Sequence, residues 1–119
     1  MTAPRPVEPV VGMEFYFRGE AALHTIARIT SKRVYYAFAA EGGAMFRDCS
    51  SLYYWMHSQA YGDVRPVLWT VGPKDSVARL GIVDGDAGDI ALWPTRDAAL
   101  AAGRAFGWER PVARRVVRR

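Results

Sequence analysis

Short segments that alternate apolar and polar side chains constrain this fold more than any other feature. In residues 13–17, apolar side chains stand on either side of Glu14 and Tyr16, which is the pattern of a half-buried β-strand. Residues 23–29 and 33–39 and a shorter stretch around Met45 and Phe46 are also rich in residues that suit strands. The turn sequences 18–20, 30–32 and 41–43 separate these segments. Four short strands with tight turns predict an antiparallel meander.

Regular alternation in residues 23–29 predicts which side chains share a face of that strand. Side chains at alternate positions of a strand point to the same face, so the segment divides into two groups of residues. The first group is Leu23, Thr25, Ala27 and Ile29, and the second is His24, Ile26 and Arg28.

A helix of about three turns is predicted after the meander. Ser50 or Ser51 can act as its N-cap, and Gly62 can supply the left-handed residue that ends it. Between them, Leu52, Trp55, Met56 and Gln59 have the spacing of one helix face.

The second half of the chain predicts three further strands, a helix and a last strand. We expect strands at 67–71, 77–83 and 90–93, the last two forming a hairpin across the loop 84–89. An alanine-rich helix should start after Thr95 and stop at Gly107. Residues 112–117 read as an edge strand.

The order of elements, ββββα followed by βββαβ, indicates an α+β fold. A chain of 119 residues fits one ordinary domain. We therefore expect an extended, proline-rich arm at 1–10 and a single domain at 11–119, made of the halves 11–62 and 63–119.

Positive charge is concentrated at the C-terminus. Five arginines and no acidic residue lie in residues 110–119, so they account for more than the whole formal net charge of +4. The first 109 residues are therefore close to neutral, which weakens the hypothesis that the whole surface binds polyanions.

The sequence predicts a cytoplasmic protein without a membrane segment. Its longest apolar stretches, such as 37–40 and 98–102, are far shorter than the roughly 20 residues that span a bilayer. The N-terminus lacks the apolar core of a signal peptide. Cys49 is the only cysteine, so no intrachain disulfide can form.

Two stretches carry a resemblance to known small domains. Residues 11–17, the run Arg33-Val34-Tyr35-Tyr36 and Gly42-Gly43 resemble the SH3-like barrels of KOW and Tudor-type modules and of short phage proteins. Residues 91–99 are similar to a strand-Pro-Thr-helix unit of small bacterial domains. The resemblance implies a partly closed barrel and a binding module of phage or mobile-element type, with no catalytic residue to carry over.

The sequence contains only some of the residues that a catalytic site or a metal site would need. Cys49 with His57 has the residue types of a nucleophile and its base, but we favour a structural interpretation, with a partly buried cysteine at a strand end and a solvent-facing histidine on a helix. The chain has too few Cys and His for structural zinc, and the loop Asp84–Asp89 lacks the glutamate that ends an EF-hand loop. No phosphate-binding glycine motif occurs. We therefore expect no enzyme, metal or cofactor.

Our leading hypothesis is a non-catalytic module that binds a host protein or protein complex, including as an anti-CRISPR-like inhibitor. Tyrosine is enriched at the energetic centres of protein interfaces, and the aromatic surface of the first helix is rich in it. The predicted partner-binding residues are Tyr53, Tyr54, His57 and Tyr61.

The alternative is a nucleic-acid-binding protein, because cations beside exposed aromatic rings hold single strands. Its residues are Arg28, Lys32, Arg33, Tyr35 and Arg47, with Arg114, Arg115, Arg118 and Arg119 at the C-terminus. For the aromatic residues we favour a structural interpretation, in which Tyr35, Phe38, Trp55 and Trp69 build the core and the arginines solvate its rim. For the terminal arginines, a binding role and a solvated, poorly ordered end are equally open. A homodimer through the edge strand is a further hypothesis.

Overall fold

The computed structural model describes residues 6–73 and 92–117. The chain divides into two compact units, Met1–Pro66 and Val67–Arg119, and each is described by itself. The boundary lies close to the border between the two predicted halves.

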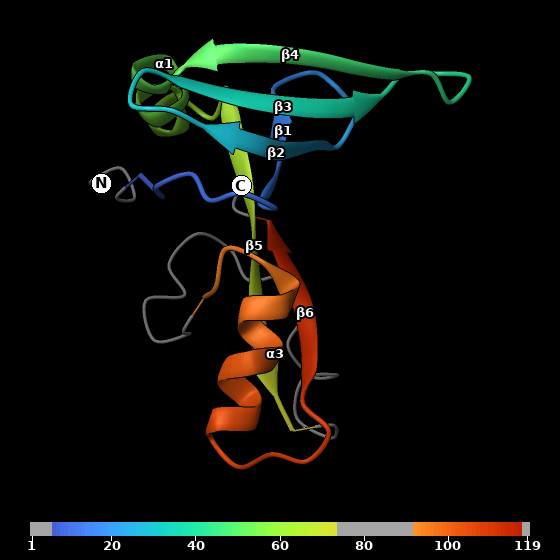
Figure 1. Cartoon of the computed structure of the whole chain (residues 1–119), viewed down its shortest axis with the longest axis vertical. Helices are drawn as coiled ribbons and strands as arrows, with labels where there is room; N and C mark the ends of the chain where they lie inside the picture. The colour runs from blue at the N-terminus through green and yellow to red at the C-terminus, as the bar shows by residue number, and fades with distance from the viewer. Residues whose placement is uncertain (1–5, 74–91, 118–119) are drawn as a thin grey trace. The chain divides into compact units, whose positions relative to one another are not determined.

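The first unit contains the predicted antiparallel meander (Figure 1). Each strand pairs with the next through an antiparallel ladder, and the pairing of β3 with β4 runs from Arg33 opposite Ser51 to Ala39 opposite Met45. Gly42 and Gly43 have φ angles of 92° and 88°, so the turn between these two strands needs glycine. The strands are β1 (Glu14–Phe17), β2 (His24–Ile29), β3 (Arg33–Ala39) and β4 (Met45–Ser51).

Hydrogen bonds order the strands of the sheet as β4-β3-β2-β1-β5-β6, where β5 is Val64–Gly72 and β6 is Val112–Val117. Two α-helices accompany these strands in the described part of the chain, so the α+β prediction is confirmed. The first and last strands of the order do not pair with each other. The sheet is therefore open, and the SH3-like barrel is not confirmed.

The predicted first helix is divided into an α-helical and a 3₁₀ part. Helix α1 (Leu52–His57) begins at Ser51, whose hydroxyl accepts a hydrogen bond from the Tyr54 amide at 3.0 Å. The 3₁₀ turn η1 (Ser58–Tyr61) follows it and ends at Gly62, which has a φ of 76°. Ser51 and Gly62 thus have the capping roles expected of them.

The core of the first unit lies between the meander and α1. Phe15 packs edge-on against Trp55 with 5.6 Å between ring centroids, and against Tyr36 with 5.2 Å. Met13, Phe15 and Trp55 are fully buried. Burial of one large apolar side chain stabilises a fold by about 1.5–3 kcal/mol, so this group holds the helix on the sheet.

Part of the N-terminal arm is held by the first unit. The Val7 amide donates to Gln59 Oε1 at 2.8 Å, and Gln59 Nε2 donates to the Val7 carbonyl at 2.9 Å. Both polar backbone groups of Val7 are thereby satisfied. This part of the predicted arm is therefore fixed to η1.

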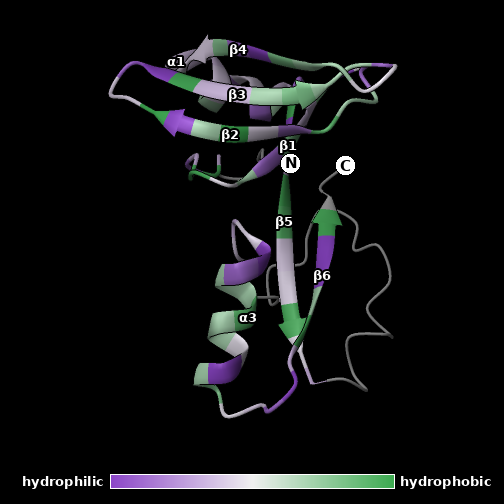
Figure 2. Ribbon diagram, turned by 45° about the vertical axis from the view of Figure 1, so that its right-hand side comes forward, coloured by the Kyte–Doolittle hydropathy of each residue, from purple (hydrophilic) through white to green (hydrophobic). Residues whose placement is uncertain are grey.

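In the second unit, helix α3 (Arg96–Ala105) accompanies the antiparallel pair formed by β5 and β6. The Thr95 hydroxyl caps the helix by accepting from the Ala98 amide at 3.1 Å. Hydrophobic and hydrophilic bands alternate around α3 (Figure 2), and Ala99 and Gly103 lie on its buried side. The predicted edge strand at 112–117 is confirmed.

The predicted hairpin at 77–83 and 90–93 lies almost entirely outside the described residues. Trp93, at the end of its second arm, forms an isolated bridge with Trp69, each amide donating to the other's carbonyl at 2.8 Å. Among the described helices, none has the length and apolar character needed to cross a membrane.

Substitution of Gly103 should destabilise the second unit. A Cβ atom there would lie 2.6 Å from Pro111 Cβ and 2.9 Å from Val71 Cγ2, and such overpacking costs about 1–3 kcal/mol. We expect Gly103→Ala to lower the free energy of unfolding in urea, although alanine has the higher helix propensity. The neighbouring Arg104→Ala, at an exposed position, should change it by less than about 0.5 kcal/mol. An unchanged or higher stability of Gly103→Ala would contradict this packing.

Candidate functional site

The first unit's sheet has two chemically different faces. Val34 and Tyr36 of β3 are buried on the side where Phe15 and Trp55 pack, which we call the inner face. Arg33 and Tyr35 alternate with them along the strand and therefore point to the opposite side, which we call the outer face.

A β-bulge brings Arg28 to the outer face. Ile26 lies opposite Tyr36, whereas Arg28 lies opposite Tyr35, so β2 advances two residues where β3 advances one. The prediction that Arg28 shares a face with His24 and Ile26 is therefore wrong. The Arg28 guanidinium instead lies over the Tyr35 ring, 4.2 Å from its centroid, within the range of a cation–π interaction.

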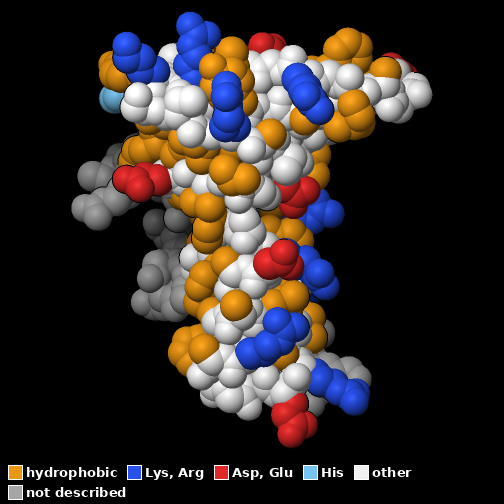
Figure 3. Space-filling model, viewed as in Figure 1, with side chains coloured by type: hydrophobic (Ala, Val, Ile, Leu, Met, Phe, Trp, Pro, Cys, Tyr) orange, Lys and Arg blue, Asp and Glu red, His pale blue; other side chains and the backbone are white. Residues whose placement is uncertain are grey.

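The outer face combines three arginines with one tyrosine. Arg47 lies opposite Ala37 and Cys49 opposite Tyr35, while Arg33 Nη1 contacts Cys49 Sγ at 3.6 Å. Within residues 6–73, the ion pairs are those of Arg18 with Asp63 and His24 with Glu20, so none of the three outer-face arginines is paired with a described carboxylate. Lys and Arg side chains gather over strands β2 to β4 (Figure 3).

Glu14 is the acidic residue of the same face. It belongs to β1 and lies opposite Thr25 of β2, which in turn lies opposite Ala37 of β3. Strands β2 and β3 therefore separate Glu14 from Arg47 of β4. The positive part of the outer face is thus formed by strands β2 to β4.

Lys32 extends this basic face to an apolar groove beside α1. The groove has a volume of about 450 Å³, and its lining includes Lys32, Leu52, Tyr53, Met56 and His57. The rings of Tyr53 and His57 are 4.0 Å apart. Two residues of the predicted partner-binding set therefore lie next to one residue of the predicted nucleic-acid-binding set.

The other two tyrosines of the partner-binding set lie elsewhere. Tyr54 lines a different pocket, on the inner face. Tyr61 is at the end of η1 and is 75% exposed, and Tyr53 is 73% exposed. The structure thus brings Tyr53 and His57 together and separates them from Tyr54.

The C-terminal arginines belong to the second unit. Arg114 lies opposite Thr70 and Arg115 opposite Trp69 in the ladder between β5 and β6, and the Arg115 guanidinium is 5.9 Å from the Trp69 ring centroid. Arg114 and Arg115 are therefore strand residues, and adjacent positions point to opposite faces. Arg118 and Arg119 lie outside the described residues.

The residues considered for catalysis and for metal binding can be located in part among the described residues. Cys49 Sγ contacts Arg33, and the ring of His57 packs on Tyr53. In the part of the chain that the structure describes, no three His, Cys, Asp or Glu side chains are grouped as metal ligands would be. The loop Asp84–Asp89 lies outside that part.

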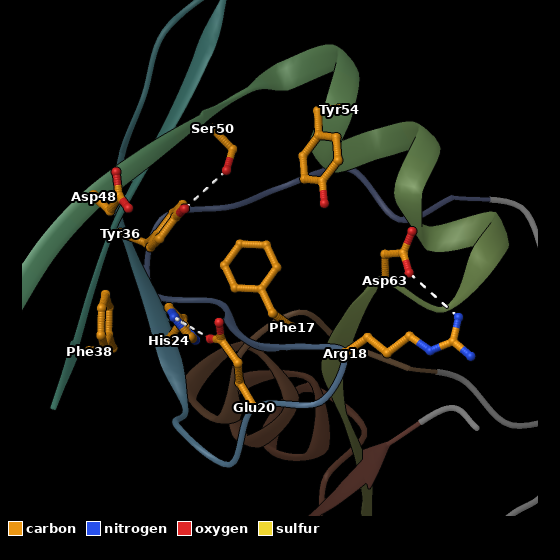
Figure 4. A pocket seen from close by; sticks show the side chains of 10 residues that line it. All are labelled: Phe17, Arg18, Glu20, His24, Tyr36, Phe38, Asp48, Ser50, Tyr54 and Asp63. Carbon is orange, nitrogen blue, oxygen red and sulfur yellow. Dashed lines mark hydrogen bonds and ion pairs between the residues drawn. The ribbon is translucent and has the colours of Figure 1, made fainter. Parts of the chain in front are cut away.

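The inner face contains a pocket of about 420 Å³ between the strands and α1 (Figure 4). Its aromatic walls come from β1, β3 and α1, and its polar groups from β2, β4, the turn after β1 and the segment between η1 and β5. Tyr36 donates to or accepts from the Ser50 hydroxyl at 3.0 Å. Burial raises the pKa of the Tyr36 phenol, and the hydrogen bond with Ser50 partly opposes this shift. The lining residues are Phe17, Arg18, Glu20, His24, Tyr36, Phe38, Asp48, Ser50, Tyr54 and Asp63.

His24 is the buried histidine that lines this pocket. Its side chain is only 2% exposed, and its ring packs among Phe15, Phe17 and Phe38 with centroid distances of 4.5–5.2 Å. The Ala22 carbonyl accepts a hydrogen bond from Nδ1 at 3.0 Å, so Nε2 is the unprotonated nitrogen of the neutral ring. Burial lowers the pKa of His24, while the Ala22 carbonyl and the charges of Glu20 and Asp48 partly oppose that shift.

Sequence reasoning missed His24 as part of a pocket. A signal was present in the spacing of His24, Ile26 and Ile29, which are two and then three residues apart. This spacing fits the inward positions of a strand with a bulge, and the structure buries His24 and Ile26 and half-buries Ile29. The sequence alone indicates only a turn at Glu20, although the turn brings its carboxylate to within 3.7 Å of His24 Nε2.

Comparisons with known proteins add no relative. No family model, no curated protein and no solved structure matches this chain.

Stability should fall as the pH is lowered through the range in which His24 takes up a proton. The pKa of His24 in the folded protein lies below its ordinary value of 6.5, so the unfolded chain binds the proton first. The contribution is fully present above about pH 6.5 and is lost as the pH falls towards the folded pKa, with a slope of at most about 1.4 kcal/mol per pH unit. Urea unfolding between pH 7.5 and 5 measures it.

The variant His24→Phe should reduce this slope, while His57→Gln should retain it. Should His24→Phe fail to fold, an NMR titration of the His24 imidazole in the unaltered protein gives the same information. A midpoint at or above 6.5 would contradict the burial of His24.

Proposed function

We propose that the protein is a non-catalytic binding module whose outer face binds single-stranded nucleic acid. The observation that carries this proposal is the placement of Arg28, Arg33 and Arg47 around Tyr35 on one open face of the meander, without described carboxylate partners. Unpaired guanidinium groups can neutralise phosphates, and bases stack on aromatic rings and on guanidinium planes.

The near-neutral composition of the chain does not oppose this proposal, because alternation along the strands separates the charges. Arg47 and Asp48 are neighbours in β4, but Arg47 lies opposite Ala37 on the outer face and Asp48 opposite Tyr36 on the inner face. The field above the outer face is therefore more positive than the net charge suggests.

Removal of the outer-face arginines should weaken binding of a labelled single-stranded oligonucleotide. For the triple variant Arg28→Gln, Arg33→Gln and Arg47→Gln, we expect an affinity at least about tenfold lower and a slope of log K against log salt that is shallower by about 2. Fluorescence anisotropy between about 50 and 200 mM salt measures both quantities.

The matched control is Arg96→Gln, Arg104→Gln and Arg110→Gln, which removes the same charge from exposed positions of the second unit. Equal losses in the two triple variants would show that net charge alone drives binding and would contradict the proposed face. No binding by the unaltered protein at low salt would exclude the function.

Tyr35 should contribute through stacking. We expect Tyr35→Ala to weaken binding by about 1–3 kcal/mol, and Tyr35→Phe to retain most of the affinity because the ring is kept. The same anisotropy titration measures this. A Tyr35→Phe variant as weak as Tyr35→Ala would show that the hydroxyl, and not the ring, makes the contact.

A protein partner at α1 is the second candidate function, as for a host-directed inhibitor of phage type. It is favoured by the exposure of Tyr53, 73% of whose surface is accessible, beside an apolar groove. For this candidate, Tyr53→Ala should abolish capture of the partner from a host extract and leave oligonucleotide binding unchanged. Loss of both activities together would instead make Tyr53 part of one continuous surface with Lys32.

A further inference from the structure

We propose that the inner-face pocket binds a small protonated amine, a primary or secondary alkylammonium ion. The inference is independent of the outer face and of its proposed polyanion, because the pocket lies on the other side of the same strands. It rests on the charge of the lining, on its aromatic walls and on Nε2 of the buried His24, which can accept a hydrogen bond.

The lining of the pocket carries an excess of negative charge. Three carboxylates, those of Glu20, Asp48 and Asp63, face a single guanidinium, Arg18. Arg18 Nη1 lies 3.7 Å from Asp63 Oδ1, so these two charges compensate each other. Glu20 and Asp48 have no Lys or Arg partner among the described residues. His24 lies between them and is neutral at any pH above its lowered pKa.

The walls of the pocket suit an organic cation better than a metal ion. Phe17, Tyr36, Phe38 and Tyr54 supply aromatic rings, and the negative faces of such rings attract cations. The carboxylates are not grouped as metal ligands in the described part of the chain. The volume of about 420 Å³ lies in the range of small-molecule pockets.

The polar group that selects an N–H donor is His24. Its Nδ1 donates to the Ala22 carbonyl at 3.0 Å, and Glu20 Oε2 lies 3.7 Å from Nε2, beyond the distance of a hydrogen bond. Nε2 is thus an acceptor on a side chain that is only 2% exposed, and Figure 4 shows the ring beside Glu20 at the edge of the pocket. An ammonium group could donate to Nε2 and to the neighbouring Glu20 carboxylate, with Asp48 adding negative charge to the lining, whereas a quaternary ammonium has no N–H to donate.

The experiment is a calorimetric titration of the whole chain with n-butylammonium, tetramethylammonium and butyrate, each to about 20 mM, since ligands of so few atoms bind weakly. We expect n-butylammonium to bind, tetramethylammonium to bind at least about fivefold more weakly, and butyrate not to bind. Equal affinity for the two cations, or binding of butyrate, would overturn the proposed recognition. Absence of heat with n-butylammonium would overturn the site.

Variants locate the site within the chain. Glu20→Gln and Asp48→Asn should each lower the affinity for n-butylammonium at least about fivefold, while Glu14→Gln, which removes a carboxylate from the outer face, should leave it unchanged. Thermal unfolding of each variant shows whether it is folded. Equal effects of all three variants would overturn the site, because they would indicate only a general attraction of cations.

A second arm distinguishes a free amine from a lysine side chain of a partner. A short blocked peptide with one central lysine is titrated beside n-butylammonium. Tighter binding of the peptide would assign the site to a protein ligand, and tighter binding of the free amine would assign it to a small molecule. If neither binds, the proposal fails, whereas the oligonucleotide titrations are unaffected by either result.

Discussion

The first unit depends on the contact of Phe15 with Trp55 and Tyr36. Phe15 belongs to β1, Tyr36 to β3 and Trp55 to α1, so one group of rings joins three elements. Because this group is buried, it decides which side of each strand is the inner face. Every side chain between the buried positions is then directed outward, including those of the basic surface. The positions of the charged residues are therefore a consequence of apolar packing, and charge pairing has little part in them.

The sheet of the first unit carries opposite charges on its two faces. Its outer face carries Arg28, Arg33 and Arg47, and its inner pocket carries Glu20 and Asp48. In a folded chain of low net charge, such a separation gives two surfaces that prefer ligands of opposite sign. The net charge of the sequence does not reveal either surface, because the positive charges of one and the negative charges of the other cancel in the sum.

Much of this arrangement could be predicted from local sequence rules. The features that could not be predicted depend on contacts between residues far apart in the sequence. Alternation identified the strands of the meander, and the capping residues Ser51, Gly62 and Thr95 marked helix ends correctly, because these signals act over a few residues. The openness of the sheet depends on which distant strands pair, which alternation does not encode. The burial of His24 was missed because a histidine is polar by type, and only the surrounding rings make its site apolar. The grouping of Arg28 with Tyr35 required the bulge, which appears only when both strands are aligned.

The bulge also bears on how this strand could tolerate changes in length. Ala27 is the extra residue of β2, exposed and without a counterpart on β3. A chain lacking Ala27 would run from Ile26 directly to Arg28 and Ile29, and regular alternation would then give the same inward and outward positions that the bulge now gives. A deletion of one codon at this point is thus compatible with the fold, whereas loss of Ile26 instead would place the small Ala27 at the buried position and leave a cavity.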